Sequence, residues 1–156
     1  MSEILINPAK TVSFSGHRIL NKDIKEIKLK EEIERLINEK YDTFLVGMAL
    51  GFDTLCFHEL EKMKEKKSIK IIACVPCPEQ ADRFSEGQRK EYFRMLDSAD
   101  KIVVISQKYS STCMQKRNEF MVDNSSVLVC YKRRESGGTA NTVNYAKKTN
   151  KKIIEL

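Results

Sequence analysis

The chain has 156 residues, of which 41% are hydrophobic and 32% are charged, and its net charge is +6. This balance is typical of a globular protein and excludes a disordered chain, and no apolar run approaches the roughly 20 residues that a membrane span needs. A chain of this length is expected to form one domain. The N-terminus lacks a basic segment followed by an apolar stretch, so we expect the protein in the cytoplasm. We also expect no membrane partner.

Short apolar segments alternate with amphipathic segments along the whole chain. The apolar segments predict strands at residues 11–15, 43–47, 69–75, 101–106, 127–131 and 152–155. The amphipathic segments predict helices over about 22–40, from about 53, after 85, after 112 and from about 139. Each helix supplies the crossover of roughly a dozen residues that two parallel strands need. The sequence therefore predicts an α/β fold, a Rossmann-like three-layer sandwich with a mainly parallel sheet of about six strands.

Three helix starts carry capping signals. Asn21 is the expected cap of the first helix. Ser85 with Gln88, and Thr112 with Gln115, have the spacing of capping boxes, in which two side chains satisfy free backbone N–H groups reciprocally. We therefore expect the third and fourth helices to begin directly after Ser85 and Thr112.

Apolar residues in two of these segments are expected in the core. The third helix should bury Tyr92, Phe93 and Leu96. The unbroken apolar run of residues 102–105 is typical of a strand that is covered on both faces. The odd number of cysteines favours small buried hydrophobic residues over a disulfide framework, and these are Cys56, Cys74, Cys77, Cys113 and Cys130.

Redox and metal chemistry are poorly supported. Cys74 and Cys77 form a C-x-x-C pattern beside a strand, but the neighbouring prolines delay any helix that could lower a thiol pKa. The two histidines, His17 and His58, are too few for a structural zinc site. We expect no metal and no cofactor.

Three predicted loops at the carboxyl edge of the sheet carry glycines and polar groups. They are residues 15–18 after the first strand, 47–53 after the second and 137–139 after the fifth. In a parallel sheet, ligands bind beyond these strand ends, where helix N-termini expose unpaired N–H groups. Glycine lets an anionic group reach the backbone. The sequence thus predicts that the three loops converge on one pocket, although any single glycine could merely turn the chain.

Other residues near these loops have two interpretations. Asp53 could be the N-cap of its helix or a ligand contact, and the two roles can coexist. Arg83 with Phe84 could clamp and stack on a base, or could equally be a lid that anchors the proline loop around Pro76. No G-x-G-x-x-G and no Walker lysine motif is present, which argues against an ordinary NAD-dependent dehydrogenase and a P-loop ATPase.

Five motifs occur in a fixed order over residues 11–154. They are SGHR, GMALGFD, PCPEQADRF, RNEFMVDNSSVLV and GGTANTVNYA. In this order they resemble the YpsA-like branch of the SLOG superfamily, which also includes the DprA proteins and the Lonely Guy (LOG) phosphoribohydrolases. The resemblance implies one SLOG-like Rossmannoid domain over residues 1–156, with a pocket for a nucleotide or a nucleotide-derived ligand.

The resemblance also assigns residues to this pocket. His17 and Arg18 would stand at its rim, and Arg117 and Asn118 would face the same space. The phosphate-facing groups would be Gly16, Gly47, Gly51, Gly137, Gly138 and Thr139. With these, the candidate ligand-binding set is Ser15, Gly16, His17, Arg18, Gly47, Gly51, Asp53, Pro76, Arg83, Arg117, Asn118, Gly137, Gly138, Thr139 and Thr142.

The LOG enzymes also use a glutamate just after their glycine-rich loop. This chain has no carboxylate over residues 141–144, so we assign no catalytic residue. An enzyme of this type would have to use Glu119 or Asp123 instead.

Three functions of different classes remain. The first is a binding module for a nucleotide, an ADP-ribose-like compound or a cyclic nucleotide signal, acting as a sensor or a sequestering protein. The second is a nucleoside or nucleotide glycosidic hydrolase. The third is a single-strand nucleic-acid binder of the DprA type, which is less favoured because the chain has no tryptophan and its basic cluster at residues 132–134 lies apart from most aromatics. We further expect a homo-oligomer.

Overall fold

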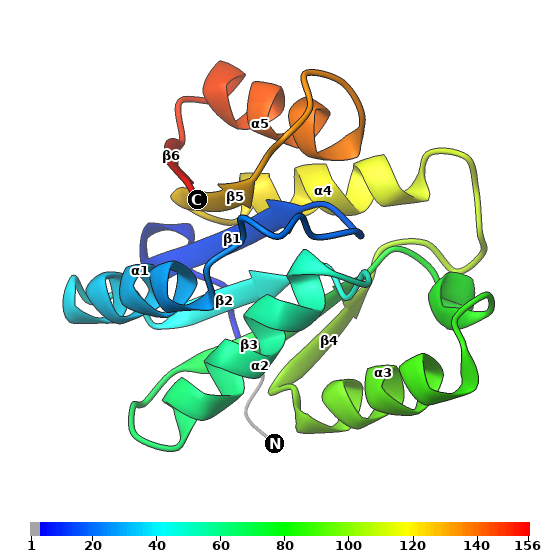
Figure 1. Cartoon of the computed structure of the whole chain (residues 1–156), viewed down its shortest axis with the longest axis horizontal. Coiled ribbons are helices and arrows are strands. Elements are labelled where there is room, and N and C mark those ends of the chain that lie inside the picture. Colours follow the sequence, from blue (N-terminus) through cyan, green and yellow to red (C-terminus); the bar gives the residue numbers. More distant parts are fainter. Residues whose placement is uncertain (1–3) are drawn as a thin grey trace.

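The computed structural model describes residues 4–156, which form a six-stranded sheet between two layers of helices (Figure 1). The strands are β1 (Thr11–Gly16), β2 (Thr43–Val46), β3 (Lys70–Val75), β4 (Lys101–Val104), β5 (Val127–Tyr131) and β6 (Lys152–Glu155). The helices are α1 (Glu26–Asn38), α2 (Phe52–Lys64), α3 (Glu86–Ser98), α4 (Cys113–Asp123) and α5 (Gly138–Lys148), with short 3-10 turns at η1 (Pro8–Lys10) and η2 (Pro78–Ala81).

The sheet has the order β4-β3-β2-β1-β5-β6, and every neighbouring pair of strands is parallel. The chain first builds outward from β1 to β4, then crosses back to place β5 on the other side of β1. The order of the strands therefore reverses between β1 and β5. Ligands of open α/β sheets bind at such a switch point, beyond the carboxyl ends of the strands. The predicted three-layer fold is confirmed, with a sheet that is parallel throughout.

Alternate residues of the central strands point to opposite helical layers. Phe14 and Val46 belong to the core beneath α1, α2 and α3. On the other face, Leu45 packs with Met121 of α4, and Leu128 packs with α5. Continuous apolar strands thus supply both faces of the sheet, as buried parallel strands require.

One of the two predicted capping boxes is present. Ser85 Oγ accepts the backbone N–H of Gln88 at 3.2 Å, and the Gln88 side chain accepts the backbone N–H of Ser85 at 2.9 Å. The box predicted at Thr112 is wrong, because its side chain makes no capping bond and Gln115 instead donates to Glu119 at 2.8 Å.

Three other predictions are corrected. The first helix starts at Glu26 with Lys25 in the N-cap position, so Asn21 lies too far before the helix to cap it, and its backbone N–H donates to the Tyr131 hydroxyl at 3.1 Å. Phe93 is 54% exposed on the outer side of α3. Ile102 and Val104 are 46% and 39% exposed, because β4 is an edge strand that pairs only with β3. The oligomeric state stays a prediction.

All five cysteines are buried and unbridged, as the sequence predicts. Burial raises the pKa of the Cys74 thiol to about 12 and that of Cys77 to about 11, which makes the C-x-x-C thiols poor nucleophiles. Over residues 4–156, no group of three His, Cys, Asp or Glu side chains could hold a metal ion. Within the same residues, no helix has the length and apolar character that crossing a membrane requires.

Candidate functional site

A cavity of about 450 Å³ opens at the switch point of the sheet, and we call it the switch-point cavity. The loops after β1, β2 and β5 converge on it, as the sequence predicts, together with residues of η2 and α4. The predicted binding residues that line it are Ser15, Gly16, His17, Arg18, Asp53, Arg117, Asn118, Gly137, Gly138 and Thr139.

The N-terminus of α5 forms one wall of the cavity. Gly137 is its N-cap with a φ of 101°, a left-handed conformation that favours glycine, and no side chain caps the helix. A Cβ added to Gly138 would meet no heavy atom within 4 Å, so this part of the backbone faces open space. The first N–H groups of α5 therefore offer an uncapped, partly positive end to the cavity.

His17 connects the loop after β1 to the loop after β5, and this connection requires the neutral form of its ring. Its Nε2 accepts the backbone N–H of Arg133 at 2.8 Å, so this nitrogen carries no proton. Its Nδ1 lies 3.4 Å from the hydroxyl of Thr139 and holds the proton of the neutral ring. Burial, with the neighbouring charges of Arg134 and Arg133, lowers the pKa of His17. The Thr139 hydroxyl thus accepts from His17 and keeps its own proton for donation.

Two glycines of the first two loops are required by packing. A Cβ on Gly51, whose φ is 80°, would lie 2.1 Å from the backbone oxygen of Arg18. A Cβ on Gly16 would lie 2.4 Å from the ring of Phe52. The backbone N–H of Phe52 also donates to the carbonyl of His17 at 3.0 Å. The glycines therefore allow the β1 and β2 loops to interlock.

Arg117 rises from α4 into the floor of the cavity. The residue is only 5% exposed, and its Nη1 donates to the carbonyl of Gly47 while its Nε donates to Asn118 Oδ1 at 2.7 Å. The Gly47 carbonyl also accepts from Gln80 Nε2 at 3.1 Å. Burial lowers the pKa of Arg117, although the nearby Asp53 carboxylate favours its charged form. This arrangement fixes the plane of a guanidinium group that lines the cavity.

Asp53, in the first turn of α2, supplies a carboxylate to the same floor. Its Oδ2 accepts the backbone N–H of Ala49 at 3.1 Å, and the residue is 7% exposed. It is not the N-cap of α2, because that position belongs to Gly51. Burial raises the pKa of Asp53 to about 6, against the opposing effect of the Arg117 charge. Asp53 therefore titrates close to neutral pH.

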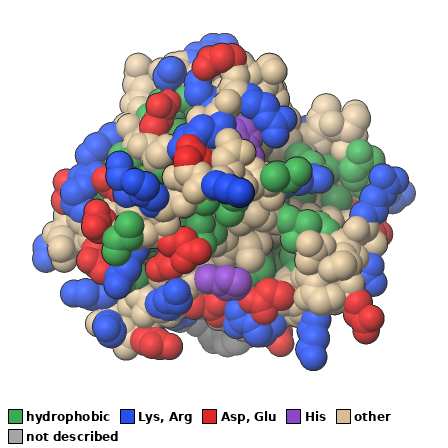
Figure 2. Space-filling view, viewed as in Figure 1, with side chains coloured by type: hydrophobic (Ala, Val, Ile, Leu, Met, Phe, Trp, Pro, Cys, Tyr) green, Lys and Arg blue, Asp and Glu red, His purple; other side chains and the backbone are tan. Residues whose placement is uncertain are grey.

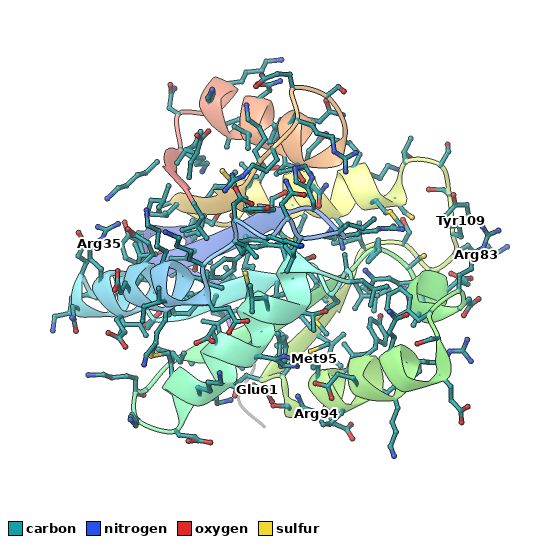
Figure 3. All side chains as sticks on the ribbon, in the orientation of Figure 1. Arg35, Glu61, Arg83, Arg94, Met95 and Tyr109 are labelled. Carbon is teal, nitrogen blue, oxygen red and sulfur yellow. The ribbon has the colours of Figure 1, made fainter. Side chains whose placement is uncertain are left out.

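The structure places five predicted residues outside the wall of the cavity: Gly47, Gly51, Pro76, Arg83 and Thr142. Gly51 packs between loops, and the Gly47 carbonyl bonds Arg117 beneath the cavity. Pro76 is buried, and its carbonyl accepts from Ser106 at 3.0 Å. Thr142 donates to the Gly138 carbonyl at 2.8 Å, and the exposed Arg83 points outward at the edge of the molecule (Figure 3).

Several cavity residues are absent from the predicted set. Phe84, which the sequence indicates as a possible stacking group but which lies outside that set, lines the cavity although its neighbour Arg83 does not, and its ring stands edge-on to that of Tyr92 with 5.6 Å between the ring centroids. Gln80 and Arg134 line it as well. Phe84 and Gln80 belong to the PCPEQADRF motif, and Arg134 belongs to the basic cluster after β5, so these two features of the sequence could have indicated them.

The carboxylates proposed for hydrolysis are not in the cavity. Neither Glu119 nor Asp123 lines it, and they instead accept from Gln115 and from Tyr145. Among the residues that line the cavity, Asp53 carries the only carboxylate.

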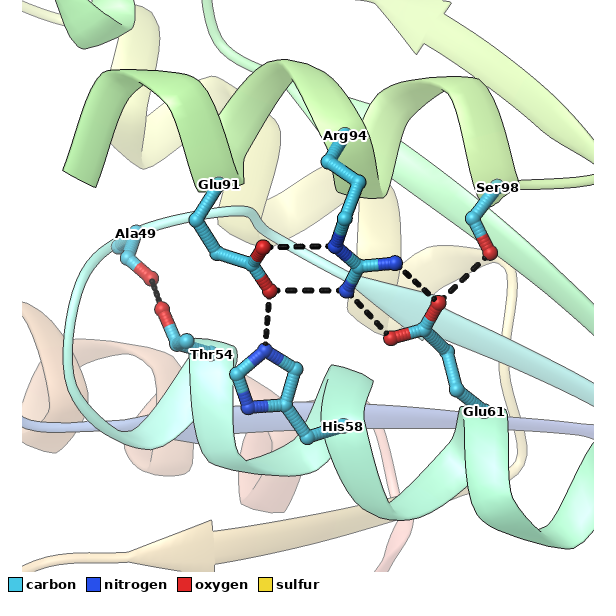
Figure 4. A network of polar contacts seen from close by, with 7 residues as sticks. All are labelled: Ala49, Thr54, His58, Glu61, Glu91, Arg94 and Ser98. Atoms are coloured by element: carbon cyan, nitrogen blue, oxygen red, sulfur yellow. Dashed lines mark hydrogen bonds and ion pairs between the residues drawn. The ribbon is translucent and has the colours of Figure 1, made fainter. Parts of the chain in front are cut away.

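A polar network outside the cavity joins α2 to α3 (Figure 4). Arg94 binds both Glu91 and Glu61, and His58 Nε2 lies 2.6 Å from Glu91 Oε2. Hydrogen bonds from Arg94 are the main reason why the pKa of Glu91 falls to about 2. The network fixes the position of α3, which follows the loop that bears Phe84.

The fold and the cavity together define a Rossmannoid α/β protein with a polar site at its switch point. The family model described as the YspA SLOG family matches residues 13–155, and the chain belongs to this family.

Two curated relatives are themselves described without an activity. The uncharacterized SPbeta prophage-derived protein YoqJ of Bacillus subtilis is 36% identical over 144 residues, which cover 79% of this chain and 82% of that protein. The UPF0398 protein BH1768 of Halalkalibacterium halodurans is 28% identical over 123 residues, which cover 76% of this chain and 65% of that protein.

Two solved DprA structures share the fold. The Helicobacter pylori protein, whose structure was described for its single-stranded DNA binding mode, gives a TM-score of 0.69 at 15% identity, over 96% of this chain and 65% of that one. The Streptococcus pneumoniae protein gives a TM-score of 0.67 at 17% identity, over 94% and 50%. This chain thus spans about half to two thirds of the length of these DprA chains.

Proposed function

We propose that the chain binds a nucleotide or a nucleotide-derived ligand, such as an ADP-ribose-like compound or a cyclic nucleotide signal, and acts as a sensor or a sequestering protein. The observation that carries the proposal is the meeting of two anion-binding elements in one cavity. The uncapped N-terminus of α5 faces it at Gly138, and the guanidinium of Arg117 lies in its floor.

The two elements come from different parts of the fold and attract the same kind of group. Helix N-termini stabilise phosphates through free N–H groups and the helix dipole. The guanidinium of Arg117, held in one plane by Gly47 and Asn118, keeps its Nη2 as a charged donor for a phosphate oxygen. A cavity of about 450 Å³ also lies in the usual size range for small-molecule sites.

Titration calorimetry with AMP, ADP-ribose and cyclic AMP tests the proposal directly. We expect at least one of them to bind the wild-type protein, and we expect Gly138→Asp to weaken that binding. Mass spectrometry of the small molecules released from natively purified protein extends the search to other nucleotides. The proposal is wrong if no nucleotide binds and none is released.

Binding of single-stranded nucleic acid is the second candidate. It is favoured by two arginines that line the cavity in addition to Arg117, namely Arg18 and Arg134, and by the fold shared with DprA. However, on the face of the molecule that Figure 2 draws, basic and acidic side chains are interspersed and form no continuous basic surface. A labelled oligothymidine measured by fluorescence anisotropy at low and high salt separates the candidates, because phosphate-backbone binding weakens steeply with salt.

A further inference from the structure

The floor of the switch-point cavity holds two buried ionisable groups of opposite sign. Asp53 is 7% exposed and Arg117 is 5% exposed. Both lie close to Gly47, where an added Cβ would be 3.0 Å from Asp53 Oδ2 and 2.9 Å from Arg117 Nη1. No ion pair joins the two side chains. The cavity floor therefore keeps both groups in place without pairing them directly.

Each group also retains one polar atom without a protein partner. Asp53 uses Oδ2 for the Ala49 N–H, and Arg117 uses Nη1 and Nε, so Oδ1 of the first and Nη2 of the second stay free. Neither atom is among the fully enclosed polar atoms that lack a partner in the described chain. Since both residues line the cavity, their free atoms open onto it. The floor thus presents an acceptor next to a donor.

This pair restricts the chemistry of the ligand. A phosphate alone would satisfy Arg117 but would be repelled by the Asp53 carboxylate. A ligand that satisfies both groups must bring a neutral hydrogen-bond donor beside its anionic group. A ribose phosphate has this composition, because its hydroxyls donate and its phosphate oxygens accept. Carboxylates recognise ribose hydroxyls in the same way in dinucleotide-binding folds.

We propose that Asp53 accepts a hydrogen bond from a ribose hydroxyl of a ligand whose phosphate lies between α5 and Arg117, so that the site selects ribonucleotides over deoxyribonucleotides. This inference rests on the proposed function, and it specifies ribose as the sugar of the ligand. At pH 7.5 the Asp53 carboxyl, whose burial raises its pKa to about 6, is mainly ionised and is a strong acceptor.

The test compares AMP, 2′-deoxy-AMP and 3′-deoxy-AMP by calorimetry at pH 7.5. With the wild-type protein, loss of the recognised hydroxyl should weaken binding at least about tenfold, because it leaves a buried acceptor unpaired. Asp53→Asn keeps an oxygen for the Ala49 N–H but turns an amide donor toward the ligand. A ribose hydroxyl can also accept from this amide, so in the variant the difference in affinity between AMP and the weaker analogue should shrink as a neutral hydrogen bond replaces a charge-assisted one.

Glu59→Gln is the matched control. Glu59 lies in the same helix, is 4% exposed and pairs with Lys62 outside the cavity. The same carboxylate-to-amide change there should leave the discrimination intact.

The possible outcomes separate the inference from the function on which it rests. Equal binding of AMP and both deoxy analogues by the wild-type protein overturns the inference alone. Absence of binding of AMP, ADP-ribose and cyclic AMP, together with the release of no nucleotide from natively purified protein, overturns the proposed function as well. The wild-type comparison decides even if Asp53→Asn does not fold.

Discussion

The ring of His17 accepts a hydrogen bond from the backbone N–H of Arg133, with 2.8 Å between Nε2 and N. A protonated imidazole cannot accept this bond, so the contact exists only while His17 is neutral. The residue thus couples the position of the β5 loop to its own titration.

This coupling predicts a loss of stability in acid. Because the pKa of His17 in the folded protein lies below its ordinary value of 6.5, its contribution to the free energy of unfolding is complete above pH 6.5. The contribution should disappear as the pH falls through the lowered pKa. Urea unfolding of the wild-type protein and of His17→Phe at pH 7.5 and pH 5 should show a difference that shrinks in acid. An NMR titration that placed the pKa of His17 above 6.5 would contradict this.

Substitution of Gly138 tests the phosphate site without strain. An aspartate at this position has free space and lies at a helix N-terminus, so the melting temperature should stay the same or rise. Its carboxylate should repel a phosphate and reduce affinity at least tenfold, or about 1.4 kcal/mol. Gly87→Asp, another open position in the first turn of a helix but outside the cavity, is the control and should bind normally.

Arg117→Lys should weaken ligand binding nearly as much as Arg117→Ala. A lysine keeps the charge but loses the planar group that serves Gly47, Asn118 and the cavity at the same time. Both variants should also melt earlier, because buried hydrogen bonds are lost. Calorimetry scaled to the folded fraction measured by circular dichroism separates the two effects. Unchanged affinity of both variants would remove Arg117 from the site.

Asp53→Asn should stabilise the unliganded protein at neutral pH. A pKa raised from 3.8 to about 6 means that ionised Asp53 disfavours the folded state by about 3 kcal/mol relative to its protonated form. Because the carboxyl pKa is higher in the folded protein, the stabilisation that proton binding to Asp53 gives the wild-type fold is complete below pH 3.8. It is lost as the pH rises through about 6. The melting temperature of the variant should therefore exceed that of the wild type at pH 7.5, and the gap should close near pH 4. Equal melting temperatures at pH 7.5 would count against this assignment.

The cysteines should resist alkylation in the native state. All five are buried, and the raised pKa values of Cys74 and Cys77 leave little thiolate at pH 8. Mass spectrometry after brief iodoacetamide treatment should show no modified cysteine in the native protein and complete modification in urea. Rapid labelling of Cys74 or Cys77 in the native protein would reopen a redox role.

The sequence predicts the convergence of the loops because parallel topology brings all carboxyl strand ends to one edge. It does not predict which glycines face a ligand. Gly51 and Gly138 occupy similar sites beside helices, yet one packs against Arg18 and the other faces open space. That distinction depends on contacts between loops far apart in the chain. The exposure of Ile102 was unpredictable for a related reason, because strand composition does not say which strand lies at the edge.

His17 also holds the loop after β2, because its carbonyl accepts the backbone N–H of Phe52. Its ring holds the loop after β5 by accepting the backbone N–H of Arg133. All three loops around the cavity are thus fastened to one residue by contacts within the protein. Their conformational entropy is lost during folding and need not be lost again when a ligand arrives. Association should therefore be a single fast step, without the slow phase that loop closure would add.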